Sequence, residues 1–150
     1  MIDLAFDLGG KTGVCVYDAD TDRYHVHQLN LTRGNIGPRS YLPAYRLRKR
    51  IWCISDWRVR NVIFEETFAR GAAKLRLDSL QTVVALWCIQ HGLKWRRTTP
   101  GEWKKATLGS GAVSALIYWR EAVKRWPDMR FPSSDTAAAR WLMEYLHHDV

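Results

Sequence analysis

The sequence predicts one α/β domain over residues 1–150, with a mixed five-stranded sheet flanked by helices. Three observations predict this fold class. A chain of 150 residues fits one compact domain, and its 47% of hydrophobic residues can supply a core. Its apolar patterns read as three strands followed by alternating helices and strands.

The first three strands are expected to pair in succession. Ile2–Phe6 is a short apolar run, Gly9 and Gly10 supply a turn, and Thr12–Tyr17 resumes an extended pattern. This order is typical of a β-hairpin. Tyr24–Leu31 alternates moderately and predicts a third strand, so that three consecutive strands are antiparallel.

The rest of the chain alternates between helical and extended patterns. Apolar residues near helical spacing predict helices, and short apolar runs between turn residues predict strands. The expected helices cover Tyr41–Trp57, Gly71–Gly92, Ala112–Trp126 and Asp135–His147, with Ser134 as the N-cap of the last and a short helical turn over Gly101–Ala106. The expected strands cover Val62–Phe64 and Leu93–Arg97.

The composition favours a polyanionic partner in a reducing compartment. Lys and Arg number 23 against 15 acidic residues, and such cations gain affinity by displacing counterions from phosphates. A generic basic surface explains the net charge of +8 equally well. The three cysteines form neither a metal pair nor a disulfide framework, which suits the cytoplasm. Asp3 and Asp7 interrupt the first apolar run, so we expect no signal peptide and no membrane partner.

Three acidic residues mark the expected site. Asp7 ends the first strand, Glu65 ends the strand at Val62–Phe64, and Asp135 begins the last helix. Ligands of α/β sheets bind at the carboxyl ends of strands. Carboxylates suit Mg²⁺ or Mn²⁺ rather than Zn²⁺, and two such ions about 4 Å apart favour phosphodiester cleavage. We therefore predict Asp7, Glu65 and Asp135 as catalytic, metal-binding residues.

Each acid alone has a simpler explanation that is equally open. Asp7 can be a turn residue before Gly9, and Asp135 can be a charge favoured by the helix dipole. Their joint placement favours a site. Glu65 and Glu66 repel each other unless a cation is near, and strand alternation sends them to opposite faces, so only one should face Asp7.

Three motifs follow one another in a set order: Ile2 to Gly13 with the first acid, Val62 to Phe68 with the second, and Asp135 to Ala139 at the last helix. In this order they resemble the RuvC-type Holliday junction resolvases, especially phage-encoded ones, over nearly the whole chain. The resemblance implies an RNase H-like nuclease domain with Glu65, not Glu66, as the catalytic glutamate. It also implies a homodimer that makes paired nicks in four-way DNA junctions with Mg²⁺ or Mn²⁺, in the host cytoplasm if a phage encodes it.

The resemblance also indicates DNA contacts. An aromatic residue near the second acid inserts at the junction centre in that family, so Phe68 is a candidate wedge; a buried helix-start position explains it equally well. The expected DNA-binding residues are Phe68, Arg70, Lys74, Lys104 and Lys105. For the basic run on the first helix we expect only a solvated face, and for the apolar face of Gly71–Gly92 a dimer interface.

The chain departs from the family in two places. A fourth acid should stand three residues before the last Asp, where this chain has Pro132, or at Ala138 if Asp135 is the earlier acid. The family also has a lysine just after a Gly-rich loop, which Gly109-Ser110-Gly111 resembles, but this chain continues with Ala112-Val113-Ser114. The alternative ligands are Glu66, Asp128, Glu144 and His147.

Two other functions compete with a structure-selective endonuclease. The missing acid is consistent with a non-catalytic protein that binds branched DNA. The stretch from Asp7 to Gly13 also resembles the first phosphate loop of actin-like ATPases, but 150 residues leave no room for their second domain.

Overall fold

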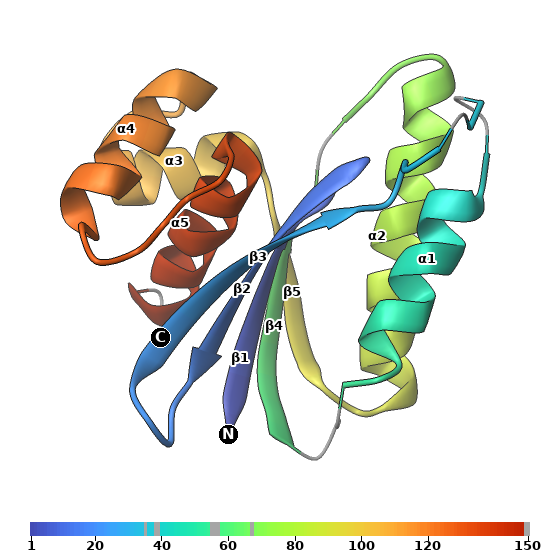
Figure 1. Ribbon diagram of the computed structural model, residues 1–150, viewed down its shortest axis with the longest axis horizontal. Coiled ribbons are helices and arrows are strands. Elements are labelled where there is room, and N and C mark those ends of the chain that lie inside the picture. Colours follow the sequence, from blue (N-terminus) through green and yellow to red (C-terminus); the bar gives the residue numbers. More distant parts are fainter. Residues whose placement is uncertain (35, 38–39, 55–57, 67, 149–150) are drawn as a thin grey trace.

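A five-stranded sheet, in the order β3-β2-β1-β4-β5, forms the centre of the computed structural model (Figure 1). The antiparallel strands are β1 (Ile2–Asp7), β2 (Lys11–Asp18) and β3 (Arg23–Asn30). The strands β4 (Val59–Glu65) and β5 (Lys94–Thr98) run parallel to β1. The structure describes residues 1–34, 36–37, 40–54, 58–66 and 68–148. The predicted mixed five-stranded sheet is confirmed.

Helices cover both faces of this sheet (Figure 1). On one face lie α1 (Leu42–Ile51) and α2 (Ala72–Gln90). On the other lie α3 (Pro100–Leu108), α4 (Ala115–Arg125) and α5 (Ser134–His148). Among the helices of the described residues, none is long and apolar enough to cross a membrane.

Strand alternation divides the core into two layers, because successive side chains point to opposite faces. Leu4 and Phe6 of β1 pack with the layer under α1 and α2, which includes Trp87. Ala5, between them, packs with the layer under α5, which includes Trp103. Odd-numbered residues of β1 therefore face α5, and this parity decides where Asp7 points.

The ends of the helices differ from the sequence prediction; α4, for example, begins at Ala115 rather than Ala112. The first helix ends at Ile51, and a turn over residues 52–54 follows; residues 55–57 of the expected helix lie outside the described residues. The expected short turn at Gly101 is a nine-residue helix, because Thr99 and Glu102 form a capping box and Gly109 closes it in the left-handed region.

The N-cap of α5 is Ser133, one residue earlier than predicted. Its hydroxyl accepts a hydrogen bond from the N–H of Thr136 at 3.3 Å, and the Thr136 hydroxyl accepts one from the Ser133 N–H at 3.3 Å. Ser134 is already helical. Both serines favour the cap position, but only Ser133 stands three residues before a hydroxyl that can reciprocate.

Candidate active site

Asp7 and Glu65 lie side by side where β1 and β4 end. The two strands are parallel and pair Phe6 with Phe64, so the next residue of each strand comes at the same edge of the sheet. Ala5 and Ile63, two residues earlier, both pack in the α5 layer. Because side chains alternate along a strand, Asp7 and Glu65 point to that layer as well.

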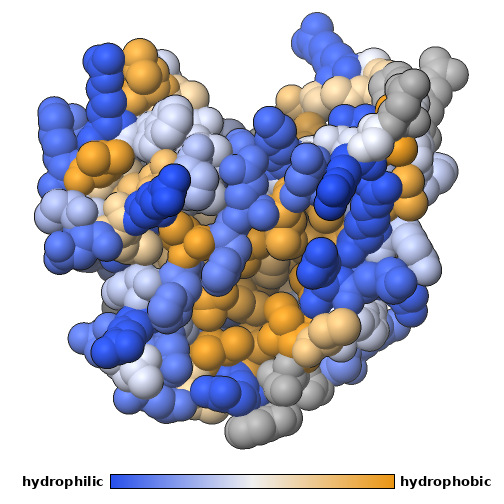
Figure 2. Space-filling view, in the orientation of Figure 1, coloured by the Kyte–Doolittle hydropathy of each residue, from blue (hydrophilic) through white to orange (hydrophobic). Residues whose placement is uncertain are grey.

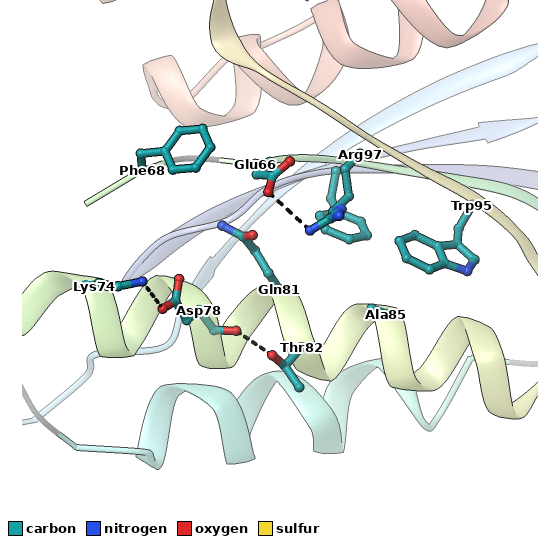
Figure 3. A pocket seen from close by; sticks show the side chains of 10 residues that line it. Glu66, Phe68, Lys74, Asp78, Gln81, Thr82, Ala85, Trp95 and Arg97 are labelled. Atoms are coloured by element: carbon teal, nitrogen blue, oxygen red, sulfur yellow. Dashed lines mark hydrogen bonds and ion pairs between the residues drawn. The ribbon is translucent and has the colours of Figure 1, made fainter. Parts of the chain in front are cut away.

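Glu66 points the other way. Its carboxylate forms an ion pair with Arg97 at 3.1 Å and lines a pocket on the α2 side of the sheet (Figure 3). Glu65 instead accepts a hydrogen bond of 2.6 Å from the indole N–H of Trp103 in the α5 layer. The expectation that only one of the two glutamates faces Asp7 is therefore confirmed, and that residue is Glu65.

Asp135 reaches the same edge from the first turn of α5. Gly13 pairs with Asp7 across the β1–β2 hairpin, and the backbone of Asp135 packs directly against Gly13. Three buried alanines behind Asp135, at positions 137 to 139, let α5 lie close to the sheet. The three predicted acids thus come from three elements to one end of the sheet, where the surface is hollowed between the two helix layers (Figure 2).

Burial and mutual repulsion act on these carboxylates. Burial raises the pKa of Asp7 well above its usual range, and the charges of Glu65 and Asp135 raise it further. Burial likewise raises the pKa of Glu65 and of Asp135. A cluster of carboxylates that resists ionisation binds protons or cations in preference to remaining bare.

Two lysines partly offset this repulsion. Lys104 lowers the pKa of both Asp7 and Glu65, and its ammonium nitrogen lies 5.5 Å from the ring centre of Trp103 and 5.3 Å from that of Tyr118. Lys11, at the start of β2, lowers the pKa of Asp135. The lysines therefore approach the acids from two sides, Lys104 from α3 and Lys11 from the hairpin.

Tyr118 of α4 packs beside the three acids. Burial raises the pKa of its phenol to about 12, and the charges of Asp7, Glu65 and Asp135 add to this effect. Its ring meets Trp103 edge to face at 5.5 Å. The pKa of Tyr118 thus depends on the charges of all three carboxylates.

Sequence reasoning did not identify Lys11, Trp103 or Tyr118 as site residues. Lys11 could have been predicted from the sequence, because it directly follows the glycine turn after Asp7. Trp103 and Tyr118 could not, since an aromatic residue on a helix is most simply explained as core. Both are core residues as well, so packing and the site share the same side chains.

The donor chemistry of the three carboxylates fits Mg²⁺ or Mn²⁺, which prefer oxygen ligands. Within the described part of the chain, however, no three His, Cys, Asp or Glu side chains stand close enough together to hold an ion. Metal binding would therefore require these carboxylates to turn toward one another.

The predicted DNA-binding residues lie on both sides of the acids. Phe68 is 85% exposed and not buried at a helix start, so the alternative explanation for it is wrong. Arg70 and Lys105 are exposed. Lys74 forms an ion pair with Asp78 at 2.7 Å beside the α2 pocket (Figure 3).

The alternative ligands lie away from Asp7 or have other partners. His147 hydrogen-bonds Asp3 at 3.0 Å, and Asp3 is four residues before Asp7, about 13 Å along the strand. Glu144 binds Arg125 at 2.8 Å and Arg140 at 3.0 Å. Asp128 is exposed in the segment between α4 and α5. The positions expected for a fourth acid hold Pro132 and the buried Ala138.

Solved structures share this fold, although no protein-family model and no curated protein matches the sequence. RuvC of Thermus thermophilus superposes with a TM-score of 0.72 and 15% identity, over 99% of this chain and 97% of that chain. T. thermophilus RuvC in complex with a Holliday junction substrate superposes with a TM-score of 0.68 and 16% identity, over 95% of this chain and 89% of that chain. The yeast mitochondrial Holliday junction resolvase Ydc2 superposes with a TM-score of 0.54 and 13% identity, over 93% of this chain and 75% of that chain. The chain has the RNase H-like fold of the RuvC-type resolvases.

Proposed function

We propose that this protein is a metal-dependent endonuclease that cleaves four-way or otherwise branched DNA. One observation carries the proposal: Asp7, Glu65 and Asp135 come together at one end of a sheet whose fold is shared with Holliday junction resolvases. The raised pKa of Asp7, caused by burial and then by the other two acids, supports it, because such a cluster favours a bound cation.

In this proposal the three carboxylates would hold two Mg²⁺ or Mn²⁺ ions. The ions, when bound, supply an activated water and stabilise the leaving oxygen. Trp103 orients Glu65 through the indole N–H, and Lys104 lies near enough to Asp7 and Glu65 to attract the scissile phosphate.

DNA binding and dimerisation belong to the same proposal. Phe68 would insert at the branch point, with phosphate contacts from Arg70, Lys74, Lys104 and Lys105. The exposed apolar side chains of α2, Leu86 and Ile89, would form the contact between two copies. Two copies related by a two-fold axis would place one site on each of two strands, as paired nicking requires.

The test is a cleavage assay on a synthetic four-way junction labelled on each strand in turn, with Mg²⁺, Mn²⁺ or EDTA. We expect nicks near the branch point in either metal and none in EDTA. A linear duplex of the same sequence should remain intact. Cleavage in EDTA, or equal cleavage of junction and duplex, would contradict the proposal.

A non-catalytic branched-DNA-binding protein is the second candidate. It is favoured by Pro132 and Ala138 at the places of the fourth acid, and by the lack of a three-ligand group among the described side chains. Tight junction binding with no nicks in either metal would support this second function over the first.

A further inference from the structure

A groove runs between β3 and α1, beside the candidate active site. It has a volume of about 620 Å³ and is lined by Gln28 to Leu31 of the β3 edge and by Arg33, Arg46, Lys49, Arg50 and Cys53. Figure 2 shows exposed hydrophobic atoms in this region, bordered by hydrophilic side chains. The groove thus has a partly apolar floor and a cationic rim.

The stretch of sequence that supplies the cations of this groove contains only basic charges. Between Asp22 and Asp56 the chain has seven Lys or Arg and no acidic residue, so this stretch carries +7 of the formal net charge of +8. None of the described residues that line the groove carries a carboxylate. The basic run on β5 differs, because there Arg97 is paired with Glu66.

The rim cations are arranged on one face of α1. Arg46, Lys49 and Arg50 stand at i, i+3 and i+4, the spacing that brings helical side chains to one side. Like charges at this spacing destabilise a helix slightly. From Arg46 to Arg50 the helix rises about 6 Å, which corresponds to roughly two base-pair steps along the axis of a DNA duplex.

Arg46 is held in place by the backbone beside the groove. Its Nη1 donates hydrogen bonds to the carbonyl oxygens of Leu31 at 2.9 Å and of Arg33 at 2.7 Å. A guanidinium fixed to the backbone loses less side-chain entropy when it meets an anion. This cation is therefore preorganised.

One end of the groove lies at the same edge of the sheet as the acids, on the opposite face. Asn30 pairs with Lys11, and the N–H of Leu31 donates to the carbonyl of Gly10 at 2.8 Å. The end of the groove at Asn30 and Leu31 therefore lies next to the turn that follows Asp7. Among the described residues that line it none is aromatic, so these side chains offer no stacking surface for unpaired bases.

We propose that this groove binds the sugar-phosphate backbone of a duplex DNA arm whose branch point lies at the carboxylates. The inference rests on the proposed function, because the arm belongs to that substrate. It replaces the expectation that the basic run on α1 is only a solvated face.

Charge reversal tests the groove. We compare Lys49→Glu plus Arg50→Glu with the control Arg120→Glu plus Arg130→Glu, which changes the net charge equally at exposed positions beyond the groove. The groove variant should bind a long-armed junction at least about tenfold more weakly than the control. Its plot of log K against log salt should lose a slope of about 2. With arms cut back to a few base pairs, the two variants should bind alike.

Cys53 offers a second test, independent of charge. It is exposed in the groove, whereas Cys15 and Cys88 are buried. DNA with a thiol tether on one arm's backbone should form a disulfide with Cys53 at a limited set of positions, and Cys53→Ser should abolish it.

The possible outcomes separate the two proposals. If the wild type cleaves junctions but the groove variant matches its control and no tether position cross-links, the groove inference is overturned and the nuclease stands. If the wild type does not prefer junctions, the proposed function fails; weaker duplex binding by the groove variant with cross-linking at Cys53 would still support the groove. Cross-linking at every position equally would count against a defined path.

Discussion

Gly13 lies so close to the backbone of Asp135 that a Cβ built on the glycine would come within 2.0 Å of the Asp135 carbonyl oxygen. The contact is between two backbones, so no side-chain rotation can relieve it. Gly13 also pairs with Asp7. One glycine therefore sets the distance between the hairpin that carries the first acid and the helix that carries the third.

Gly13→Ala should push α5 away from the sheet. We expect the free energy of unfolding to fall by about 1–3 kcal/mol, as for other overpacked positions. The rate of metal-dependent cleavage should fall as well, because the third carboxylate is displaced from the other two. Thermal unfolding and the junction assay measure the two effects. Gly101→Ala is the control, because a Cβ there meets nothing within 4 Å. Equal behaviour of the two variants would show that the close approach is unimportant.

Asp7→Asn should stabilise the metal-free protein while abolishing cleavage. The pKa of Asp7 is raised by burial and by its acidic neighbours, so the native state disfavours ionised Asp7, and this cost grows as pH rises above the usual aspartate pKa. Removing the charge should raise Tm by a few degrees at neutral pH, since about 1 kcal/mol shifts Tm by roughly 2–4 °C. Junction binding should persist.

Asp128→Asn is the matched control for that change. Asp128 is exposed in the segment between α4 and α5, so neither Tm nor cleavage should change. Loss of cleavage in Asp128→Asn would instead identify it as the missing ligand. A Tm of Asp7→Asn below that of the wild type would contradict the repulsion argument.

Trp103→Phe should move the acidic limb of the cleavage pH profile to higher pH. The indole N–H lowers the pKa of Glu65 against the effect of burial, so its loss leaves Glu65 protonated at higher pH. The missing bond should also cost about 1–3 kcal/mol of stability at neutral pH. Trp87→Phe is the control, because the buried indole N–H of Trp87 has no partner among the described residues. An unshifted profile would remove Trp103 as a positioning residue.

Asp3→Asn should weaken the fold at neutral pH and reduce its sensitivity to acid. Burial alone would raise the pKa of Asp3, but hydrogen bonds from His147, Arg60 and Asn61 and the charge of Arg60 lower it below its usual range. A depressed pKa gives stability that is present above the unfolded value of 3.8 and is lost as pH falls toward the folded value. Because Arg60 and His147 are partly exposed, losing these charge-assisted hydrogen bonds should cost about 1–3 kcal/mol. Parallel acid-unfolding curves for variant and wild type would contradict this.

Phe68→Ala should separate binding at the branch point from folding. The ring is 85% exposed, so unfolding free energy should change by less than about 0.5 kcal/mol. Junction distortion, followed by fluorescence transfer between labelled arms, should fall together with cleavage. Leu116→Ala, another exposed apolar residue, is the control on α4. Unchanged distortion would remove the wedge role.

Much of the fold follows from patterns that act locally. Alternation predicted the hairpin and the opposite directions of Glu65 and Glu66, because a strand fixes side-chain parity whatever packs against it. Asp7 and Glu65 could be predicted at strand ends because each directly follows a short apolar run. Helix ends were less predictable: both Ser133 and Ser134 favour a cap, and the reciprocal partner, Thr136, decided between them.

The environment of the site depends on contacts between distant residues. Trp103 meets Glu65 across 38 positions of sequence, and no local pattern encodes that pairing. The influence of Lys11 on Asp135 arises only after α5 packs on the hairpin. The sequence predicted which acids to examine, but the side chains that tune them required the assembled fold.

The three acids come from the first strand, the fourth strand and the last helix of the described chain. During synthesis on a ribosome, α5 is the last of these elements to emerge, and until it docks on Gly13 the third carboxylate is absent. For the proposed nuclease, a growing polypeptide should therefore carry the site lysines, Lys11 and Lys104, well before the three carboxylates are assembled. The proposed activity would then require α5 to be completed and docked.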